Sequence, residues 1–189
     1  MEVEYINIHQ EIVDRCKSGD KAAFRELYDL YSKAMFNICY RITNDQYEAE
    51  DVLQEAFVSA FKNIGAFRAE SSFGAWLKKI VVNRAINHMK KKKLKLTSLE
   101  ENFETADLNY HNEVSDNLDD SNYNIEMIKK AVNLLPDGYR MVFSLYLLEG
   151  YDHAEIAQIM EITESTSKSQ YNRAKKKLKN ILEELCRIN

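Results

Sequence analysis

Cations and amides recur at helical spacing in one stretch of the chain. Lys79, Asn83, Asn87 and Lys90 follow one another at intervals of three or four residues, so they share one face of a helix. Lysine ammonium groups bind phosphate oxygens and asparagine amides pair with base edges, so this face favours contact with nucleic acid. The alternative is an ordinary solvated face whose C-terminal lysines offset the helix dipole.

A second stretch of this kind lies near the end of the chain, where Lys168, Ser169, Asn172 and Arg173 point roughly one way. It belongs to a long predicted helix at 164–185, which follows a short helix at 152–160 and a tight turn. This succession, with a polar and basic second helix, is typical of the helix-turn-helix, whose second helix reads the major groove of DNA. A plain helical hairpin with a solvated basic tail is the alternative.

Acidic residues form a third pattern. Glu48, Asp51 and Glu55 lie about one turn apart on a predicted helix, away from its apolar residues. By contrast, the sequence has no nucleophile paired with a base, no phosphate-binding loop and no His/Cys cluster with metal-ligand spacing. We therefore expect a protein that is not an enzyme and that has no cofactor or metal.

The elements that carry these patterns are predicted to be helices throughout. One Pro and five Gly in 189 residues argue against β-sandwiches and proline-rich linkers. Apolar residues instead recur every three or four positions, which predicts an all-α protein. The expected helices cover about 8–18, 21–42, 46–64, 73–95, 124–134, 138–148, 152–160 and 164–185.

Capping residues mark several helix boundaries. Asp20 and Asp45 precede apolar periodic segments and are predicted N-caps. Asp152 and Glu155 have the spacing of a capping box, and Thr163 is the expected N-cap of the last helix. The two halves of the predicted helix-turn-helix are therefore both bounded by local sequence signals.

The charge is segregated along the chain, although the net value is only −4. Residues 1–96 carry 16 Lys/Arg and 13 Asp/Glu, and residues 127–189 carry 10 and 8. Residues 97–126 carry nine acidic and no basic side chains. Because this segment also lacks apolar periodicity, we expect a linker that is disordered on its own between two small domains, 1–96 and 127–189.

Nothing in the sequence indicates export or membrane insertion. The first residues lack the basic start and apolar core of a secretory signal, and no apolar run reaches the ~18 residues of a membrane span. Cys16, Cys39 and Cys186 are widely spaced, which fits buried thiols in a reducing cytoplasm better than disulfides or zinc ligands. We therefore expect a cytoplasmic protein.

Four segments together resemble a known family. Residues 47–57 (YEAEDVLQEAF) and 67–77 (FRAESSFGAWL) resemble region 2 of bacterial RNA polymerase sigma factors. Residues 134–143 (LLPDGYRMVF) and 149–157 (EGYDHAEIA) resemble region 4. The likeness covers about 21–95 and 127–182, in the family's order, and is to the extracytoplasmic-function (ECF) group of the sigma-70 family.

The resemblance implies a function and partners. It implies two helical domains that give core RNA polymerase promoter recognition and strand opening, with an anti-sigma factor as a further partner. It also implies that the acidic linker threads the polymerase cleft. Two other functions stay open on the residues alone: a stand-alone helix-turn-helix regulator with an N-terminal sensor or dimerisation module, and a helical adaptor without nucleic-acid contacts.

The resemblance also assigns residues to three contacts. The polymerase clamp would bind Asp51, Gln54 and Glu55. The loop at 67–73 would take a flipped base and the next helix would contact the minus-10 element, which assigns to that element Phe67, Arg68, Ser71, Ser72, Trp76, Lys79, Asn83, Arg84, Asn87 and Lys90. Trp76 would stack on the melted duplex, and a core position is its alternative. The minus-35 element would contact Thr166, Lys168, Ser169, Asn172 and Arg173.

Three residues depart from the family pattern in the predicted helix-turn-helix. Glu161 stands where the turn often has Gly, Ser167 where a buried Val is common, and Gln170 where Arg is common. A left-handed residue other than Gly costs on the order of 1 kcal/mol, which a small domain can absorb. We therefore expect an intact motif with an altered sequence preference.

Overall fold

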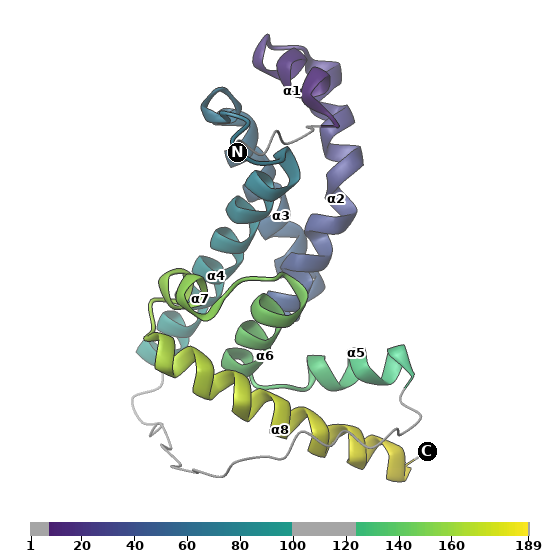
Figure 1. The fold of residues 1–189 in the computed structure, drawn as a ribbon, viewed down its shortest axis with the longest axis vertical. Coiled ribbons are helices and arrows are strands. Elements are labelled where there is room, and N and C mark those ends of the chain that lie inside the picture. The colour runs from purple at the N-terminus through teal and green to yellow at the C-terminus, as the bar shows by residue number, and fades with distance from the viewer. Residues whose placement is uncertain (1–7, 100–123, 189) are drawn as a thin grey trace, which may run out of the picture. The chain divides into compact units, whose positions relative to one another are not determined.

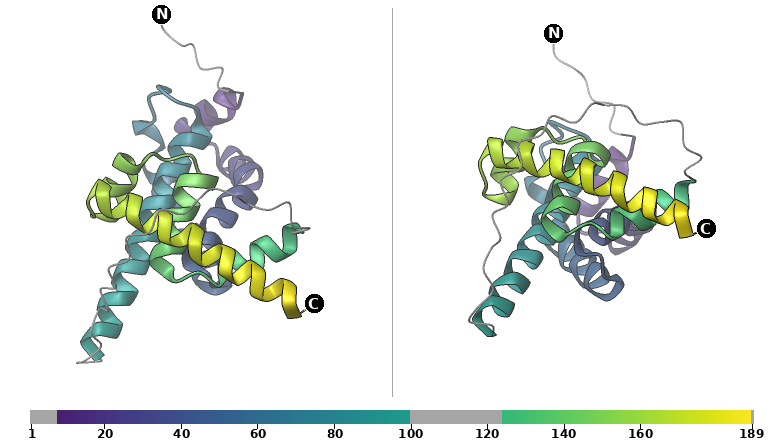
Figure 2. Two further views of the ribbon diagram at one scale, coloured as in Figure 1. Left: turned by 60° about the horizontal axis from the view of Figure 1, so that its bottom comes forward. Right: turned by 90° about the horizontal axis from the view of Figure 1, so that it is seen from below.

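The computed structural model describes residues 8–99 and 124–188, and every regular element in these ranges is helical. The all-α prediction is thereby confirmed. The chain divides between Lys91 and Lys92 into two compact units, whose helices are drawn in Figures 1 and 2. None of the described helices is both long and apolar enough to cross a membrane.

The first unit contains α1 (Gln10–Lys17), α2 (Lys21–Thr43), α3 (Gln46–Lys62), the short 3-10 helix η1 (Ile64–Ala66) and most of α4 (Phe73–Leu99). Its helices begin where the capping residues predict. The Asp20 side chain accepts a hydrogen bond from the Ala22 backbone N–H, and Asp45 accepts one from Glu48. Between α2 and α3 the chain reverses through Asn44, whose left-handed φ of 57° ends α2.

The core of the first unit forms between the apolar faces of α2, α3 and α4. Each helix buries residues three or four positions apart, as an amphipathic helix must. The largest fully buried side chains are Leu27 and Ile42 of α2, Val52 of α3, and Phe73, Leu77, Val81 and Ile86 of α4. This packing leaves the acidic side of α3 and the polar side of α4 at the surface.

The second unit contains α5 (Ile125–Asn133), α6 (Asp137–Phe143), the π-helical turn η2 (Ser144–Leu148), α7 (His153–Met160) and α8 (Glu164–Ile188). The single helix expected at 138–148 is therefore an α-helix followed by a π-turn. Helix α8 runs unbroken in every view of Figures 1 and 2. Its apolar face packs with α5 and α6 around a core of Ala131, Val132, Leu135, Phe143, Ala174, Ile181 and Leu182.

Polar groups inside the second unit fix the chain around its turns. Arg140 is 1% exposed, and its guanidinium donates to the Leu135 carbonyl at 2.9 Å and to the Asp137 carboxylate at 2.7 Å. The buried charge is thus paired across the bend that contains Pro136. Burial raises the pKa of Tyr151, two residues before α7, to about 12, so its hydroxyl stays neutral.

Helix α4 extends past its expected end at 95 and enters the segment 97–126, which was expected to be a linker. It runs to Leu99, whereas α5 begins at Ile125, where the helix expected at 124–134 should begin. Asn124 caps α5 by accepting a hydrogen bond from the Met127 backbone N–H at 2.8 Å. The remainder of the expected linker, 100–123, lies outside the described residues, so its disorder stays a prediction.

Candidate nucleic-acid and polymerase interface

The acidic face of α3 is at the surface. Asp51, Gln54 and Glu55, the residues assigned to polymerase binding, are all exposed. On the opposite side of the helix, Val52 and Phe57 are buried, so packing against the core fixes which way the acidic face points. The arrangement presents carboxylates and one amide to a basic partner.

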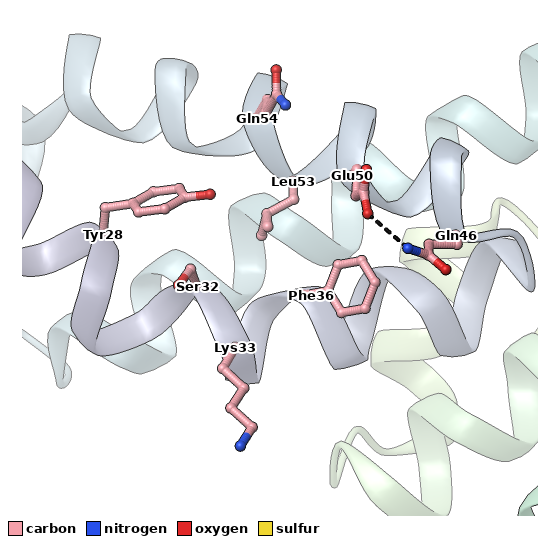
Figure 3. Close-up of a pocket in the computed structure, with 8 residues that line it drawn as sticks. All are labelled: Tyr28, Ser32, Lys33, Phe36, Gln46, Glu50, Leu53 and Gln54. Carbon is pink, nitrogen blue, oxygen red and sulfur yellow. Dashed lines mark hydrogen bonds between the residues drawn. The ribbon is translucent and has the colours of Figure 1, made fainter.

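A groove lies beside this face, between α2 and α3 (Figure 3). Its volume is about 470 Å³, and it is lined by Tyr28, Ser32, Lys33 and Phe36 of α2 and by Gln46, Glu50, Leu53 and Gln54 of α3. Gln46 donates to the Glu50 carboxylate across one turn of α3 at 3.1 Å. The sequence did not predict the groove, because the period of each helix does not show which residues of the two helices meet.

The polar face of α4 is also at the surface. Lys79, Asn83, Arg84 and Asn87 are exposed, and Lys90 is half-buried. These residues share one side of the helix. The other side is buried, as described above for the core of the first unit. Cations and amides therefore lie along one rigid helix, where each could contact a phosphate or a base edge.

Arg84 joins the α4 face to the α3 face. Its guanidinium donates to the Ser59 hydroxyl of α3 at 3.3 Å and lies 3.9 Å from the Glu55 carboxylate. One turn further on, His88 lies 3.4 Å from the Glu48 carboxylate. The residues assigned to polymerase and to DNA are therefore neighbours, which the sequence did not indicate because they belong to different helices.

The loop that precedes α4 divides into a buried start and an exposed middle. Phe67 is 3% exposed and packs against Phe73 and Trp76, with ring centroids 5.7 and 5.4 Å away. Large aromatic side chains gain from such burial, so this conformation places Phe67 in the core. Arg68 and Ser72 are exposed and Ser71 is half-buried.

Trp76 combines the two positions considered for it. Its ring is half-buried, packed at 5.6 Å from Phe73 as well as against Phe67. Part of the residue remains open to solvent. Trp76 thus packs in the core and is still partly exposed.

The helix-turn-helix of the second unit forms from α7 and α8. Asp152 and Glu155 make a complete capping box at the start of α7. The turn passes through Glu161, whose φ of 58° is left-handed, and the Thr163 hydroxyl accepts a hydrogen bond from the Thr166 backbone N–H at 3.0 Å. The capping and turn predictions are confirmed here.

The four residues expected to read DNA are exposed together on α8. They are Lys168, Ser169, Asn172 and Arg173, whereas Thr166 is half-buried. Lys168 pairs with Glu164 one turn earlier at 2.6 Å, and the Ser169 hydroxyl donates to the Thr166 carbonyl at 3.0 Å. Ala174 is fully buried and anchors the other side of α8.

Ser167, one of the three departures from the family pattern, has a hydrogen-bond partner inside the motif. It is fully buried, and its hydroxyl hydrogen-bonds with Nδ1 of His153 on α7 at 2.9 Å. The His153 ring stacks on Tyr146, with centroids 4.4 Å apart and planes inclined by 11°. A polar contact thus joins the two helices of the motif at the position where a buried Val is common in the family.

Comparison with known proteins covers both units. Residues 27–94 match the family described as Sigma-70 region 2, and residues 125–178 match the family described as Sigma-70, region 4. The ECF RNA polymerase sigma factor SigW of Bacillus subtilis (strain 168) is 31% identical over 92% of this chain and 96% of its own length. The ECF RNA polymerase sigma-E factor of Escherichia coli (strain K12) is 30% identical over 94% of this chain and 96% of its own.

Solved structures with a similar fold include two that cover most of this chain. The sigma factor RpoE in complex with the anti-sigma factor NepR, from Bartonella quintana, aligns with a TM-score of 0.55 at 21% identity. That alignment covers 85% of this chain and 96% of the other. CnrH in complex with the cytosolic domain of CnrY aligns with a TM-score of 0.52 at 19% identity, over 92% and 96% of the two chains.

Proposed function

The chain belongs to the ECF group of RNA polymerase sigma factors, and we propose which of its surfaces carry out the steps of promoter recognition. Proteins of this family are not enzymes; they direct core RNA polymerase to promoters, and the polymerase supplies the chemistry. This membership decides against a stand-alone regulator and against an adaptor without nucleic-acid contacts.

The observation that supports the minus-35 contact is a row of exposed polar side chains on α8. Lys168, Ser169, Asn172 and Arg173 share one face of the second helix of a formed helix-turn-helix. In this motif the second helix lies in the major groove, where Arg binds guanine and Asn binds adenine through paired hydrogen bonds. Thr166 lies near the helix N-terminus, where backbone N–H groups favour a phosphate.

The loop at 67–72 and α4 form the proposed minus-10 surface. Lys79, Asn83 and Asn87 would follow the groove side, while Arg84 and Lys90 would contact phosphates. Flipping a base costs a few kcal/mol, and stacking on an aromatic ring returns about 1–3 kcal/mol per base. The partial exposure of Trp76 supports that role, with Arg68, Ser71 and Ser72 in the loop before it. Phe67 supports the loop from the core.

The acidic face of α3 is the proposed polymerase contact. Asp51, Gln54 and Glu55 are exposed and present a face suited to a basic clamp. Gln54 also borders the groove between α2 and α3, so a docked partner could contact both the acidic face and the groove. The two proposed contacts of this unit meet where Arg84 approaches Glu55.

Region 2 and region 4 would act as separate domains, 1–96 and 127–189, joined by the acidic linker. Thirty residues span up to ~100 Å when extended, whereas a free flexible chain of that length averages ~30 Å end to end. Two promoter elements about two helical turns apart lie roughly 70 Å from each other. The linker would therefore be held stretched in the polymerase cleft, where its negative charge imitates nucleic acid.

The partners follow from this assignment. One solved structure of similar fold is a sigma factor in complex with an anti-sigma factor, and another is CnrH in complex with the cytosolic domain of CnrY. We propose that this chain is also held by an anti-sigma factor, and that it acts in the cytoplasm, where polymerase and promoters are found. Acidic faces and grooves on the first unit offer surface for such a partner.

The test compares DNA binding with and without polymerase. Each unit offers only a short basic patch, and the acidic linker repels the duplex, so the free protein should bind promoter DNA poorly at physiological salt. A gel shift with core polymerase added should show a specific complex. Tight, sequence-specific binding by the free chain would contradict the proposal.

A further inference from the structure

Helix α1 contacts the start of the loop that precedes α4. The Lys17 ammonium, in the last turn of α1, donates a hydrogen bond to the backbone carbonyl of Phe67 at 3.0 Å. The same ammonium lies 5.6 Å from the centroid of the Phe67 ring. Fifty positions separate the two residues in sequence, so this is a tertiary contact. A backbone carbonyl held by a charged donor is fixed more firmly than one bound to water.

A second contact from the start of α1 reaches the other end of the loop. His9 Nδ1 and the Tyr31 hydroxyl share a hydrogen bond of 2.8 Å, and their rings meet edge to face at 5.5 Å. The Tyr31 ring in turn packs 5.3 Å from Phe73, the first residue of α4. A Cβ atom added at Gly74 would lie 3.0 Å from Tyr31 Cε1, so the ring presses closely on the first turn of α4.

Between these two ends the loop has little contact with the core. Residues 68–72 are exposed or half-buried. Ala69 has a left-handed φ of 58°, a conformation that costs an alanine about 1 kcal/mol and persists only where the surroundings impose it. The loop is short, so the positions of Phe67 and Phe73 decide its shape.

We propose that α1 positions this loop for promoter opening, with Lys17 and Tyr31 as positioning residues that contact no DNA themselves. The inference rests on the proposed minus-10 role of the loop. Lys17 fixes where the loop begins, and Tyr31, held by His9, fixes where α4 begins. A loop whose ends are fixed cannot change its shape to accommodate a wrong base, so its preference among bases is sharper.

The experiment measures base preference in the holoenzyme formed with core polymerase. The probes are single-stranded oligonucleotides carrying the non-template minus-10 sequence of a promoter that the wild-type holoenzyme transcribes, with each of the four bases at each position. Lys17→Met keeps an unbranched side chain of similar length but removes the donor, and Lys17→Arg keeps a donor. Lys21→Ala changes an exposed lysine at the first position of α2 and serves as the matched control.

The expected result is a loss of discrimination with little loss of folding or polymerase binding. Lys17→Met should reduce the affinity ratio between the preferred and the least preferred base by about two- to ten-fold, the factor that one hydrogen bond carries. Lys17→Arg should restore most of the ratio, Tyr31→Phe should lower it, and Lys21→Ala should not change it.

Two results would overturn the inference. One is an unchanged base preference in Lys17→Met, and the other is an equal loss of affinity for every base, which a merely structural role would produce. A wild-type holoenzyme without any base preference in this assay would instead contradict the minus-10 function of the loop itself.

Discussion

At the scale of single residues, the account depends on exposed charges whose positions are fixed by packing on the other side of each helix. Asp51 is exposed one position away from buried Val52, and Arg173 is exposed one position away from buried Ala174. Substitution of such a residue changes a surface contact while the core stays intact. Effects on partners can therefore be separated from effects on folding.

Charge reversal at Asp51 tests the polymerase contact. Asp51→Lys should weaken association with core polymerase by at least about ten-fold, because it places a cation opposite a basic partner. Pull-down or fluorescence titration with core polymerase measures the change. Glu183→Lys, the same charge change at an exposed position of α8, is the control and should bind normally. Normal binding by Asp51→Lys would remove α3 from the polymerase interface.

Truncation of Arg173 tests the minus-35 contact. Arg173→Ala should cost about 1–3 kcal/mol of binding to the preferred minus-35 sequence, because a paired hydrogen bond to a base is lost. Transcription from promoters with single base changes in that element should become less selective at one position. Lys129→Ala, at an exposed position of α5, should leave selectivity unchanged. An equal fall on all minus-35 variants would show that Arg173 contacts only phosphate.

At the scale of elements, helix positions followed from the sequence because their signals are local. Asp20, Asp45, Asp152 and Thr163 cap the helices that they were expected to cap. The π-helical turn η2 was not predicted, because an apolar pattern of eleven residues does not distinguish a continuous α-helix from one that widens at its end.

Contacts between elements could not be predicted in the same way. Helical periodicity shows that Arg84 and Glu55 are both polar, but only the packing of α3 on α4 brings them together. The burial of Phe67 depends equally on Phe73 and Trp76 of the next helix. In each case the residues belong to different elements. A single sequence does not show how close two such residues lie in the folded protein.

The His153–Ser167 hydrogen bond gives an element-scale prediction. Ser167→Val should lower the free energy of unfolding of the second unit by about 1 kcal/mol, because His153 Nδ1 loses its buried partner. Circular dichroism during urea denaturation follows both units, whereas fluorescence of Trp76, the sole tryptophan, follows only the first. In Ser167→Val the urea concentration at the midpoint of the fluorescence transition should therefore equal that of the wild type. A Ser167→Val protein as stable as wild type would show that the contact contributes nothing.

At the scale of the whole molecule, the segregation of charge explains how a chain of net charge −4 can bind DNA. Two units with basic helix faces flank an acidic segment, so each unit has a short basic patch for the phosphate contacts that we propose. Neither patch is large enough for firm binding alone, and core polymerase would supply the remaining contacts. The acidic face of α3 is the surface that we propose for the contact with core polymerase.

Transcription in vitro with purified core polymerase and a library of random promoters tests this account most directly. The account predicts transcripts that require the protein and start downstream of two shared sequence elements about two helical turns apart. It also predicts that Asp51→Lys abolishes these transcripts while Glu183→Lys does not. Absence of protein-dependent transcripts, or transcripts that share no such elements, would contradict it.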